Sequence, residues 1–272
     1  SVDKLPVCPY LHLKMSDYDY RFSGIARLYG VEALKRLRAA HVCVVGIGGV
    51  GSWTVEALAR SGVGKLTLID MDDVCLSNAN RQLHALDGTV GKLKIDVMAE
   101  RARAIQPECE INTIADFFTA TTAEKLLSTD FDTVIDAIDQ QTNKCLLLDG
   151  CKKRDIPVVT VGAAGGKWDP TAVQSADLTK VSYDALLKRV RKSLRRDFGY
   201  SRDPKRKWGI DAIFSTEKAV YPSPDGGVCE KPDSQTSLKL DCSSGFGSAT
   251  HVTGTFGFAA ASVAIRKIIA EA

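Results

Sequence analysis

Two kinds of apolar pattern alternate along the first 162 residues of the chain. Short continuous runs rich in β-branched residues predict buried strands, whereas apolar residues that recur every three or four positions predict helices. Strands are predicted at 42–45, 65–69, 110–115, 132–136 and 156–161. Helices are predicted from 20 to about 40, from about 52 onward, and at 91–105, 122–127 and 143–154. This alternation is typical of an α/β fold, in which helices cover both faces of a mainly parallel sheet.

The pattern changes after residue 162. The remaining segments are predicted to be a weakly strand-like stretch at 163–179, a basic helix at 183–196, a basic loop at 200–208, a strand at 210–215, a mobile crossover at 221–241 and a closing helix at 248–270. We therefore predict a doubly wound, mainly parallel sheet of the Rossmann-like type with a C-terminal elaboration. Its parts are a flexible N-terminal arm at 1–19, a core at 20–162 and a region at 163–272 that belongs to the same globular unit.

The turn GIGGVG at 46–51 joins the first predicted strand to a helix. Backbone without Cβ can turn sharply and approach a phosphate, and the N–H groups at a helix N-terminus favour anions. Asp70 ends the second predicted strand, 19 residues after Gly51, where its carboxylate can accept hydrogen bonds from a ribose. The spacing predicts a nucleotide-binding βαβ unit, whose candidate phosphate contacts are Gly46, Gly48, Gly49 and Gly51.

A second set of polar side chains is predicted above the same sheet edge. An NAD-dependent dehydrogenase would share the glycine turn and Asp70, but this set favours a triphosphate, because Arg and Lys neutralise charge that develops during attack on phosphorus. The set comprises Asp72, Ser77, Asn78, Asn80, Arg81, Gln82, Lys94 and Asp139. Within it, Arg81, Lys94 and Asp139 are the catalytic candidates, and Asp139 with Asp72 is the candidate Mg²⁺ site. The alternatives are solvated helix charges for Arg81 and Lys94, and a helix cap for Asp139.

Five motifs in this order give the chain a resemblance to a known superfamily. GIGGVGS, LIDMDDV, LSNANRQ, VGKLK and DAID resemble the adenylation core of the ubiquitin-activating-enzyme-like superfamily, which includes bacterial activators of sulfur-carrier proteins. The resemblance implies that ATP and Mg²⁺ bind here and that a carboxylate attacks the α-phosphate. It also implies a homodimer, in which an arginine from the partner enters the site. Gly24 stands at the aligned position here, so either Arg21 or Arg27 substitutes for that arginine or the group is absent. The paired zinc cysteines common in the sulfur-carrier activators are missing.

The rest of the chain resembles one branch of that superfamily. RFSGIARLYG, GAAGGKWDPT, IFSTE and LDCSSGFGSATHVTGTFGF are similar to the enzymes that dehydrate threonylcarbamoyladenosine in tRNA. The branch implies ATP-dependent activation of the threonyl carboxylate followed by ring closure, through an adenylate or a phosphate. The alternative function is adenylation of the C-terminus of a small sulfur-carrier protein. A free carboxylate is a poor electrophile, so ATP is needed in either reaction.

A basic run between 188 and 207 favours an RNA substrate independently of the resemblance. It carries a net charge of +8 in 20 residues, although the whole chain carries only +3. Such a run suits a phosphate backbone, and Tyr200 and Trp208 are candidates to stack on bases; a solvated charged face is the alternative. The candidate RNA-binding residues are Lys188, Arg189, Arg191, Lys192, Arg195, Arg196, Arg202, Lys205, Arg206 and Lys207.

The eight cysteines form no C-x-x-C pair, which excludes a zinc ribbon and gives no support to a disulfide framework. A reducing compartment and a cytoplasmic location are expected. Cys242 is the candidate catalytic thiol, because it precedes a glycine-rich turn into the last helix, where a helix N-terminus would lower a thiol pKa. It would form a thioester or accept sulfur from a partner such as a cysteine desulfurase. An inert packed thiol is the alternative, and Cys229 is the second candidate.

Residues 243–265 contain no Asp, Glu, Lys or Arg and are long enough to span a bilayer. Small and hydroxylated residues fill most of these positions, which favours a buried or dimer-interface helix over a membrane span. His251 is expected to be a polar group on this helix rather than a ligand. With 272 residues, 44% hydrophobic and 25% charged, the chain is long and apolar enough for a full doubly wound sheet, and extensive disorder is excluded.

Overall fold

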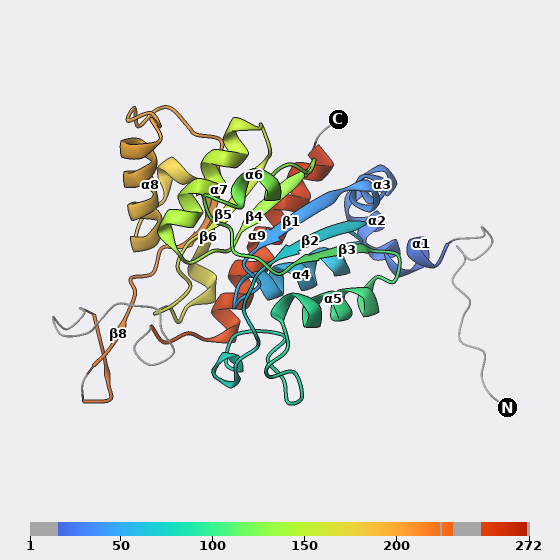
Figure 1. Cartoon of the computed structure of the whole chain (residues 1–272), viewed down its shortest axis with the longest axis horizontal. Coiled ribbons are helices and arrows are strands. Elements are labelled where there is room, and N and C mark those ends of the chain that lie inside the picture. Colours follow the sequence, from blue (N-terminus) through green and yellow to red (C-terminus); the bar gives the residue numbers. More distant parts are fainter. Residues whose placement is uncertain (1–15, 224, 231–245, 271–272) are drawn as a thin grey trace.

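The computed structural model describes residues 16–223, 225–230 and 246–270, and it contains a seven-stranded sheet in the order β3-β2-β1-β4-β5-β7-β6 (Figure 1). Every neighbouring pair in this sheet is parallel except β6–β7, which is antiparallel. The predicted fold class is therefore confirmed. The strands are β1 (His41–Val45), β2 (Lys65–Ile69), β3 (Glu110–Ile114), β4 (Thr133–Asp136), β5 (Val158–Val161), β6 (Val173–Asp177) and β7 (Asp211–Ser215).

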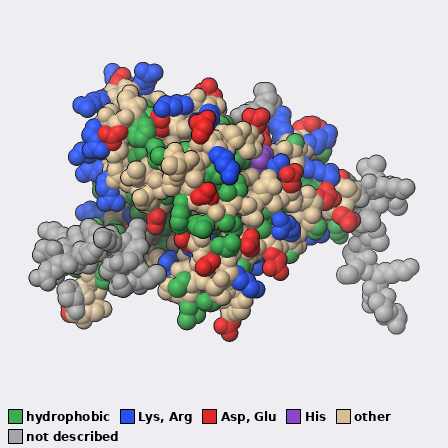
Figure 2. Space-filling view, viewed as in Figure 1, with side chains coloured by type: hydrophobic (Ala, Val, Ile, Leu, Met, Phe, Trp, Pro, Cys, Tyr) green, Lys and Arg blue, Asp and Glu red, His purple; other side chains and the backbone are tan. Residues whose placement is uncertain are grey.

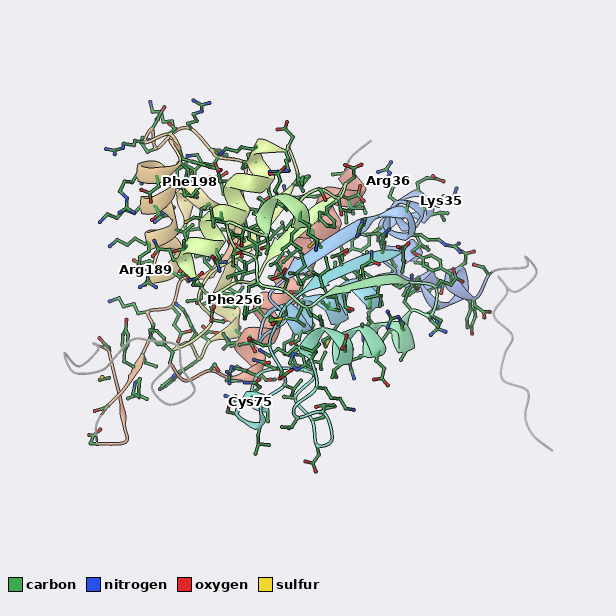
Figure 3. All side chains as sticks on the ribbon, viewed as in Figure 1. Lys35, Arg36, Cys75, Arg189, Phe198 and Phe256 are labelled. Atoms are coloured by element: carbon green, nitrogen blue, oxygen red, sulfur yellow. The ribbon has the colours of Figure 1, made fainter. Side chains whose placement is uncertain are left out.

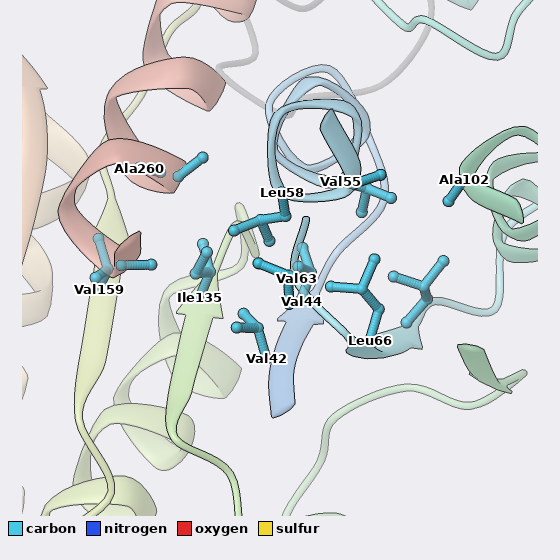
Figure 4. Close-up of a cluster of buried hydrophobic side chains, with 14 of the residues drawn as sticks. Val42, Val44, Val55, Leu58, Val63, Leu66, Ala102, Ile135, Val159 and Ala260 are labelled. Carbon is cyan, nitrogen blue, oxygen red and sulfur yellow. The ribbon is translucent and has the colours of Figure 1, made fainter. Parts of the chain in front are cut away.

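Helices cover both faces of the sheet because successive side chains of each strand point to opposite faces. On one face, Val42, Val44, Ile135 and Val159 pack with α4, α5 and α9 (Figure 4). On the other, Cys43, Val45 and Val134 pack with α7 and α8. The helices are α1 (Asp17–Arg21), α2 (Ser23–Tyr29), α3 (Val31–Ala39), α4 (Gly51–Arg60), α5 (Lys94–Ile105), α6 (Ala123–Leu126), α7 (Gln141–Lys153), α8 (Ala185–Asp197) and α9 (Thr250–Ala270).

The single helix predicted from 20 to about 40 is wrong. Three short helices occupy this stretch, and the chain turns at Gly30, whose φ of 95° is a conformation that L side chains rarely adopt. Folded structure also begins before the predicted end of the arm at residue 19. Tyr18 is 2% exposed, and its hydroxyl donates to the Gly62 carbonyl oxygen at 2.6 Å. Part of the predicted arm therefore belongs to the core.

The C-terminal elaboration completes the sheet rather than forming a separate unit. Its strand β7 pairs in parallel with β5, and β6 adds an antiparallel edge in the stretch that was predicted only as weakly strand-like. A small hairpin of β8 (Tyr221–Pro222) and β9 (Val228–Cys229) lies within the predicted crossover. Helix α9 is long and apolar enough to cross a membrane, but 61% of its most apolar window is buried inside the protein. The sheet and α4 account for that burial, because α9 packs on them.

Candidate nucleotide-binding site

The strand register places three chain segments at one edge of the sheet. Val45 of β1 pairs with Ile69 of β2 and with Asp136 of β4, so the residues that follow these three strands begin at the same level. The strand order reverses between β1 and β4, which is where ligands bind in open α/β sheets. The glycine turn, Asp70 and the segment before Asp139 therefore meet at this edge, as the sequence predicted.

The glycine turn is shaped by contact with the chain after β4. Gly46 has a φ of 90°, and a Cβ atom there would lie 2.9 Å from the Ala137 carbonyl oxygen. A Cβ atom on Gly51 would lie 1.8 Å from the Gly46 carbonyl oxygen, which no side chain can accommodate. Helix α4 begins at Gly51 without a side-chain cap. The Ser52 N–H already donates to the Gly48 carbonyl oxygen at 3.1 Å, so the N–H groups of Gly51 and Trp53 are the ones that a phosphate beside the turn would use.

Asp70 organises the site in addition to its predicted contact with ribose. One carboxylate oxygen accepts a hydrogen bond from the Ile47 N–H at 2.6 Å, and the other accepts one from the Asp72 N–H at 2.8 Å. The same carboxylate therefore ties the glycine turn to the segment after β2. Each carboxylate oxygen has a second lone pair with which to accept a ribose hydroxyl.

The predicted cationic residues lie on the segments that follow β2. Lys94 begins α5, is buried, and donates from Nζ to Asp72 Oδ2 at 2.7 Å. Arg81 donates to the Ser77 carbonyl oxygen and to Asn80 Oδ1, and its Cγ and Cδ lie 3.5 and 3.7 Å from where a Cβ atom on Gly49 would be. Both cations are therefore held at the nucleotide edge of the sheet.

The amides of the LSNANRQ motif have structural partners. Asn78 is buried and accepts from the Cys75 N–H, which closes the short 3₁₀ helix Leu76–Asn78. Asn80 donates to the Ser248 carbonyl oxygen at 2.7 Å and so connects this motif to the segment before α9. Gln82 Nε2 lies near Gly48, and Gln82 Oε1 is buried without a hydrogen-bond partner among the described residues.

Sequence reasoning missed a buried ion pair beneath the site. Lys144 Nζ lies 2.8 Å from Asp136 Oδ2, and Thr160 Oγ1 donates to the same oxygen at 2.6 Å; all three residues are completely buried. Burial raises the pKa of Asp136, while Lys144 and Thr160 oppose that rise. The other oxygen of Asp136 accepts from the Ile138 N–H, so the pair orients the segment that leads to Asp139. An Asp at a strand end and a Lys eight residues later were the available signal.

His84 supports the glycine turn from below and was also missed. Its Nε2 lies 2.7 Å from the Ile47 carbonyl oxygen; since a carbonyl only accepts, Nε2 carries the hydrogen. The side chain is 1% exposed, and Nδ1 has no partner among the described residues. Burial lowers the pKa of His84, which keeps the ring neutral. The neighbours of His84 in the segment RQLHAL gave no sign of this contact.

Neither of the two candidate thiols, Cys242 and Cys229, is the thiol that lies next to the LSNANRQ motif. Cys242 lies outside the described residues, and the Sγ of Cys229 lies 3.6 Å from the Tyr221 carbonyl oxygen in the small hairpin. Cys75 is exposed beside Ser77, whose hydroxyl donates to its Sγ at 3.2 Å. That hydrogen bond lowers the pKa of the Cys75 thiol. Cys75 directly precedes the LSNANRQ motif, and its lowered pKa contrasts with the buried thiols of Cys43, Cys109, Cys145 and Cys151, whose pKa burial raises.

A family model named the ThiF family matches residues 22–269, which is nearly the whole chain. The chain belongs to the ThiF family. A tRNA threonylcarbamoyladenosine dehydratase of Haemophilus influenzae is 51% identical over 94% of this chain and 96% of its own length. The structure of the Escherichia coli tRNA N6-threonylcarbamoyladenosine dehydratase with ATP matches at a TM-score of 0.84 and 47% identity, covering 95% of this chain and 98% of that one. Its AMP complex matches at 0.83 with the same identity and coverage.

These similarities confirm the resemblance on which the sequence interpretation depended. They extend over both the core and the C-terminal elaboration of this ThiF-family chain, so the relatives share the elaboration as well as the glycine turn. The roles of the individual site residues stay predictions.

The basic run forms one face of α8 and the loop after it (Figure 2). Arg189 projects from α8 on the side away from the sheet (Figure 3). The exposed members are Lys188, Arg189, Lys192, Arg196, Arg202, Lys205, Arg206 and Lys207. Arg196 pairs with Asp197, whose negative charge offsets that of the guanidinium. The remaining exposed cations form a positive surface on this ThiF-family chain, opposite the face of α8 that packs on α7.

Four predicted RNA contacts need correction. Arg191 is half-buried and donates to the Leu178 and Val181 carbonyl oxygens, and the Arg195 guanidinium lies 5.3 Å from the centre of the Trp208 ring. Trp208 is only 7% exposed and packs edge-on against Tyr200, with ring centroids 4.9 Å apart. The apolar bodies of these side chains anchor the basic loop to the core. They are therefore not available to stack on bases or to follow a phosphate backbone.

We expect the stability of the protein to fall as the pH drops below 6.5. Burial lowers the pKa of both His41 and His84 below 6.5, so just below this pH the unfolded state binds more protons than the folded state. The free energy of unfolding should decrease by at most about 1.4 kcal/mol per pH unit for each histidine. Urea unfolding at a series of pH values measures this slope. A His41→Gln, His84→Gln variant with the same slope as the wild type would contradict the assignment.

Proposed function

We propose that this chain catalyses the ATP-dependent dehydration of threonylcarbamoyladenosine in tRNA. The observation that carries the proposal is the convergence of Gly46, Asp70, Lys94 and the segment before Asp139 at the switch point of the sheet. It is supported by the similarity to a dehydratase that covers nearly the whole length of both chains. The similarity to an ATP complex and to an AMP complex of the same dehydratase supports ATP as the nucleotide. The absence of any C-x-x-C pair and the basic surface disfavour the sulfur-carrier alternative.

The reaction begins with attack of a threonyl carboxylate oxygen on the α-phosphorus of ATP, which forms an acyl-adenylate and releases pyrophosphate. The N–H groups of the glycine turn and α4 bind the phosphates, and Lys94 and Arg81 neutralise the charge that develops on them. An internal nucleophile of the threonylcarbamoyl group then attacks the activated carbonyl carbon and expels AMP. The carboxylate oxygen leaves with AMP, and the nucleoside has lost the elements of water.

The acidic residues at the site fit Mg²⁺ bound together with phosphates. Asp139 is exposed and has no hydrogen-bond or ion-pair partner among the described residues, so its carboxylate is available to a cation. Asp72 is 54% exposed and pairs with Lys94. The described residues form no group of three or more His, Cys, Asp or Glu for a metal, and Mg²⁺ typically takes only one or two carboxylates beside substrate phosphates. Mg²⁺ would supply charge neutralisation at the phosphates.

The deciding experiment incubates the protein with ATP, Mg²⁺ and tRNA that carries the open modification. Mass spectrometry of the digested nucleosides should show the loss of one water, and chromatography should show AMP and pyrophosphate in equal amounts. Formation of ADP and phosphate instead would indicate that the activated intermediate is an acyl-phosphate rather than an adenylate. An unchanged nucleoside, with ATP consumed only after a sulfur-carrier protein is added, would overturn the proposal in favour of the alternative.

The exposed face of α8 is proposed to bind the tRNA backbone. Replacing Lys188 and Lys192 together by alanine should weaken tRNA binding at all modification states and reduce the slope of log affinity against log salt by about 2, since each lysine releases about one counterion. Filter binding at several salt concentrations measures the slope. The matched control replaces the exposed Lys125 and Lys153, which lie on α6 and α7. Equal slopes for the two double variants would exclude α8 as the backbone contact.

The face formed by α1, α2 and α3 is proposed to be a homodimer interface. Tyr20, Leu28 and Val31 are 69%, 68% and 60% exposed there, and Arg27 lies beside them on α2, as the arginine in trans would require. Leu28→Glu should convert a dimer into a monomer of 29.4 kDa in light scattering, because it places a charge in an apolar contact. Leu86→Glu, at another exposed leucine, should remain dimeric. Dimeric Leu28→Glu protein would disprove this interface.

A further inference from the structure

Lys167 is a buried lysine whose charge has no counterion among the described residues. It lies in the loop between β5 and β6, is 3% exposed, and donates from Nζ to the Glu217 carbonyl oxygen. No described residue forms an ion pair with it. Burial lowers the pKa of Lys167, and the more distant charges of Asp184 and Glu217 oppose that shift. An unpaired buried charge is costly, so Lys167 is a candidate binding residue whose charge an anionic ligand would neutralise.

The two nearest carboxylates are occupied by backbone donors. Glu217 accepts from the Trp168 and Asp169 N–H groups at 3.0 Å, and Asp184 accepts from the Ala163 and Leu187 N–H groups. These bonds fix the loop that carries Lys167 and leave its ammonium to another anion. The arrangement therefore favours binding of an external carboxylate over an internal salt bridge.

Lys167 lines a cavity of about 240 Å³. The aromatic rings at this cavity are Trp168, which is 62% exposed, and Tyr221, which packs against Phe246 with ring centroids 5.1 Å apart. A cation beside exposed aromatic rings suits a ligand that joins a carboxylate to a planar base, since flat rings stack on bases.

The cavity adjoins the nucleotide site. Its wall includes Ser248, whose carbonyl oxygen accepts from Asn80 of the LSNANRQ motif at 2.7 Å. Thr253, the fourth residue of α9, donates from its hydroxyl to the Arg81 carbonyl oxygen and lies against Gly49. Hydrogen bonds thus connect the cavity wall and the start of α9 to Asn80 and Arg81 of the nucleotide site.

We infer that this cavity receives the modified adenosine, with Lys167 binding the threonyl carboxylate and Trp168 contacting the base. The inference depends on the proposed function, which supplies the carboxylate and the base. In this arrangement Lys167 orients the carboxylate toward the neighbouring nucleotide site, and its charge is neutralised only when the modified residue is bound. The enzyme would then distinguish tRNA with the open modification from the same tRNA without it.

The test measures binding of full-length protein, with ATP, to tRNA that carries the open modification and to the same tRNA lacking it. The wild type should prefer the modified tRNA, and Lys167→Met should lose that preference through an affinity loss of about 10- to 100-fold for the modified tRNA alone. Affinity for ATP and for unmodified tRNA should not change. Lys218→Met removes an equal charge from an exposed neighbour that does not line the cavity, and should behave as wild type.

Trp168→Ala provides a second variant, because truncation of an exposed ring does not threaten the fold; it should also weaken binding of the modified tRNA selectively. A preference that survives in Lys167→Met, or in Trp168→Ala if Lys167→Met does not fold, overturns the inference. A wild type that dehydrates the modified tRNA while both variants do so at its rate overturns this inference and leaves the proposed function standing. A wild type that never dehydrates it overturns the proposed function.

Discussion

Lys94→Met is expected to reduce the rate of ATP-dependent dehydration by about 10²- to 10³-fold, the usual loss when one preorganised charge is removed from a developing anion. The expected effect is on kcat more than on ATP affinity, because the glycine turn and the start of α4 still bind the phosphates. Single-turnover formation of the cyclised nucleoside, together with ATP titration, separates the two quantities.

The structure offers a close control for this variant. Lys92 lies two residues before Lys94 and is exposed, so Lys92→Met removes the same charge outside the site. Removing Lys94 leaves Asp72 without its partner, but Asp72 is 54% exposed and water solvates it, so the midpoint of thermal unfolding should barely move. If Lys94→Met turned over at the wild-type rate, Lys94 would be only a structural partner of Asp72.

Lys144→Met should lower the free energy of unfolding by about 3–5 kcal/mol, because it leaves the completely buried Asp136 without a counterion. Urea unfolding measures the loss. A variant that replaces Asp136 by leucine as well should recover part of it, since no unpaired charge then remains inside the protein. A loss as large in the double variant would show that packing, rather than charge, controls this position.

Lys153 provides the comparison for Lys144 on the same helix. It is 71% exposed and pairs with Asp149 one turn earlier, so Lys153→Met should cost less than about 1 kcal/mol. The contrast between the two lysines depends only on burial. Because Asp136 also holds the Ile138 N–H, Lys144→Met protein that remains folded should bind ATP less well than Lys153→Met protein.

The α/β architecture could be predicted from local patterns because each β-branched run is buried on both faces of a parallel sheet. The helix boundaries near the N-terminus could not be predicted, because the chain turns at Gly30 although the helical spacing of apolar residues continues on both sides of it. The edge strand β6 was hard to recognise because its residues are half-exposed and lack a continuous apolar run. Burial of Tyr18 depends on Gly62, which is distant in sequence, and no local pattern reports such a contact.

Sequence by itself determined the fold class, the glycine turn and the order of the motifs, because these follow from steric rules that act within a few residues. Motif order also indicated the resemblance to the ubiquitin-activating-enzyme-like superfamily, which the match to the ThiF family supports. Only the tertiary structure decided which charges are buried, because burial depends on strands and helices far apart in the chain. Among the basic residues it separated Arg191 and Arg195, which anchor a loop, from exposed Lys188 and Lys192. It also revealed the unpaired charge of Lys167, which no motif distinguishes from a surface lysine.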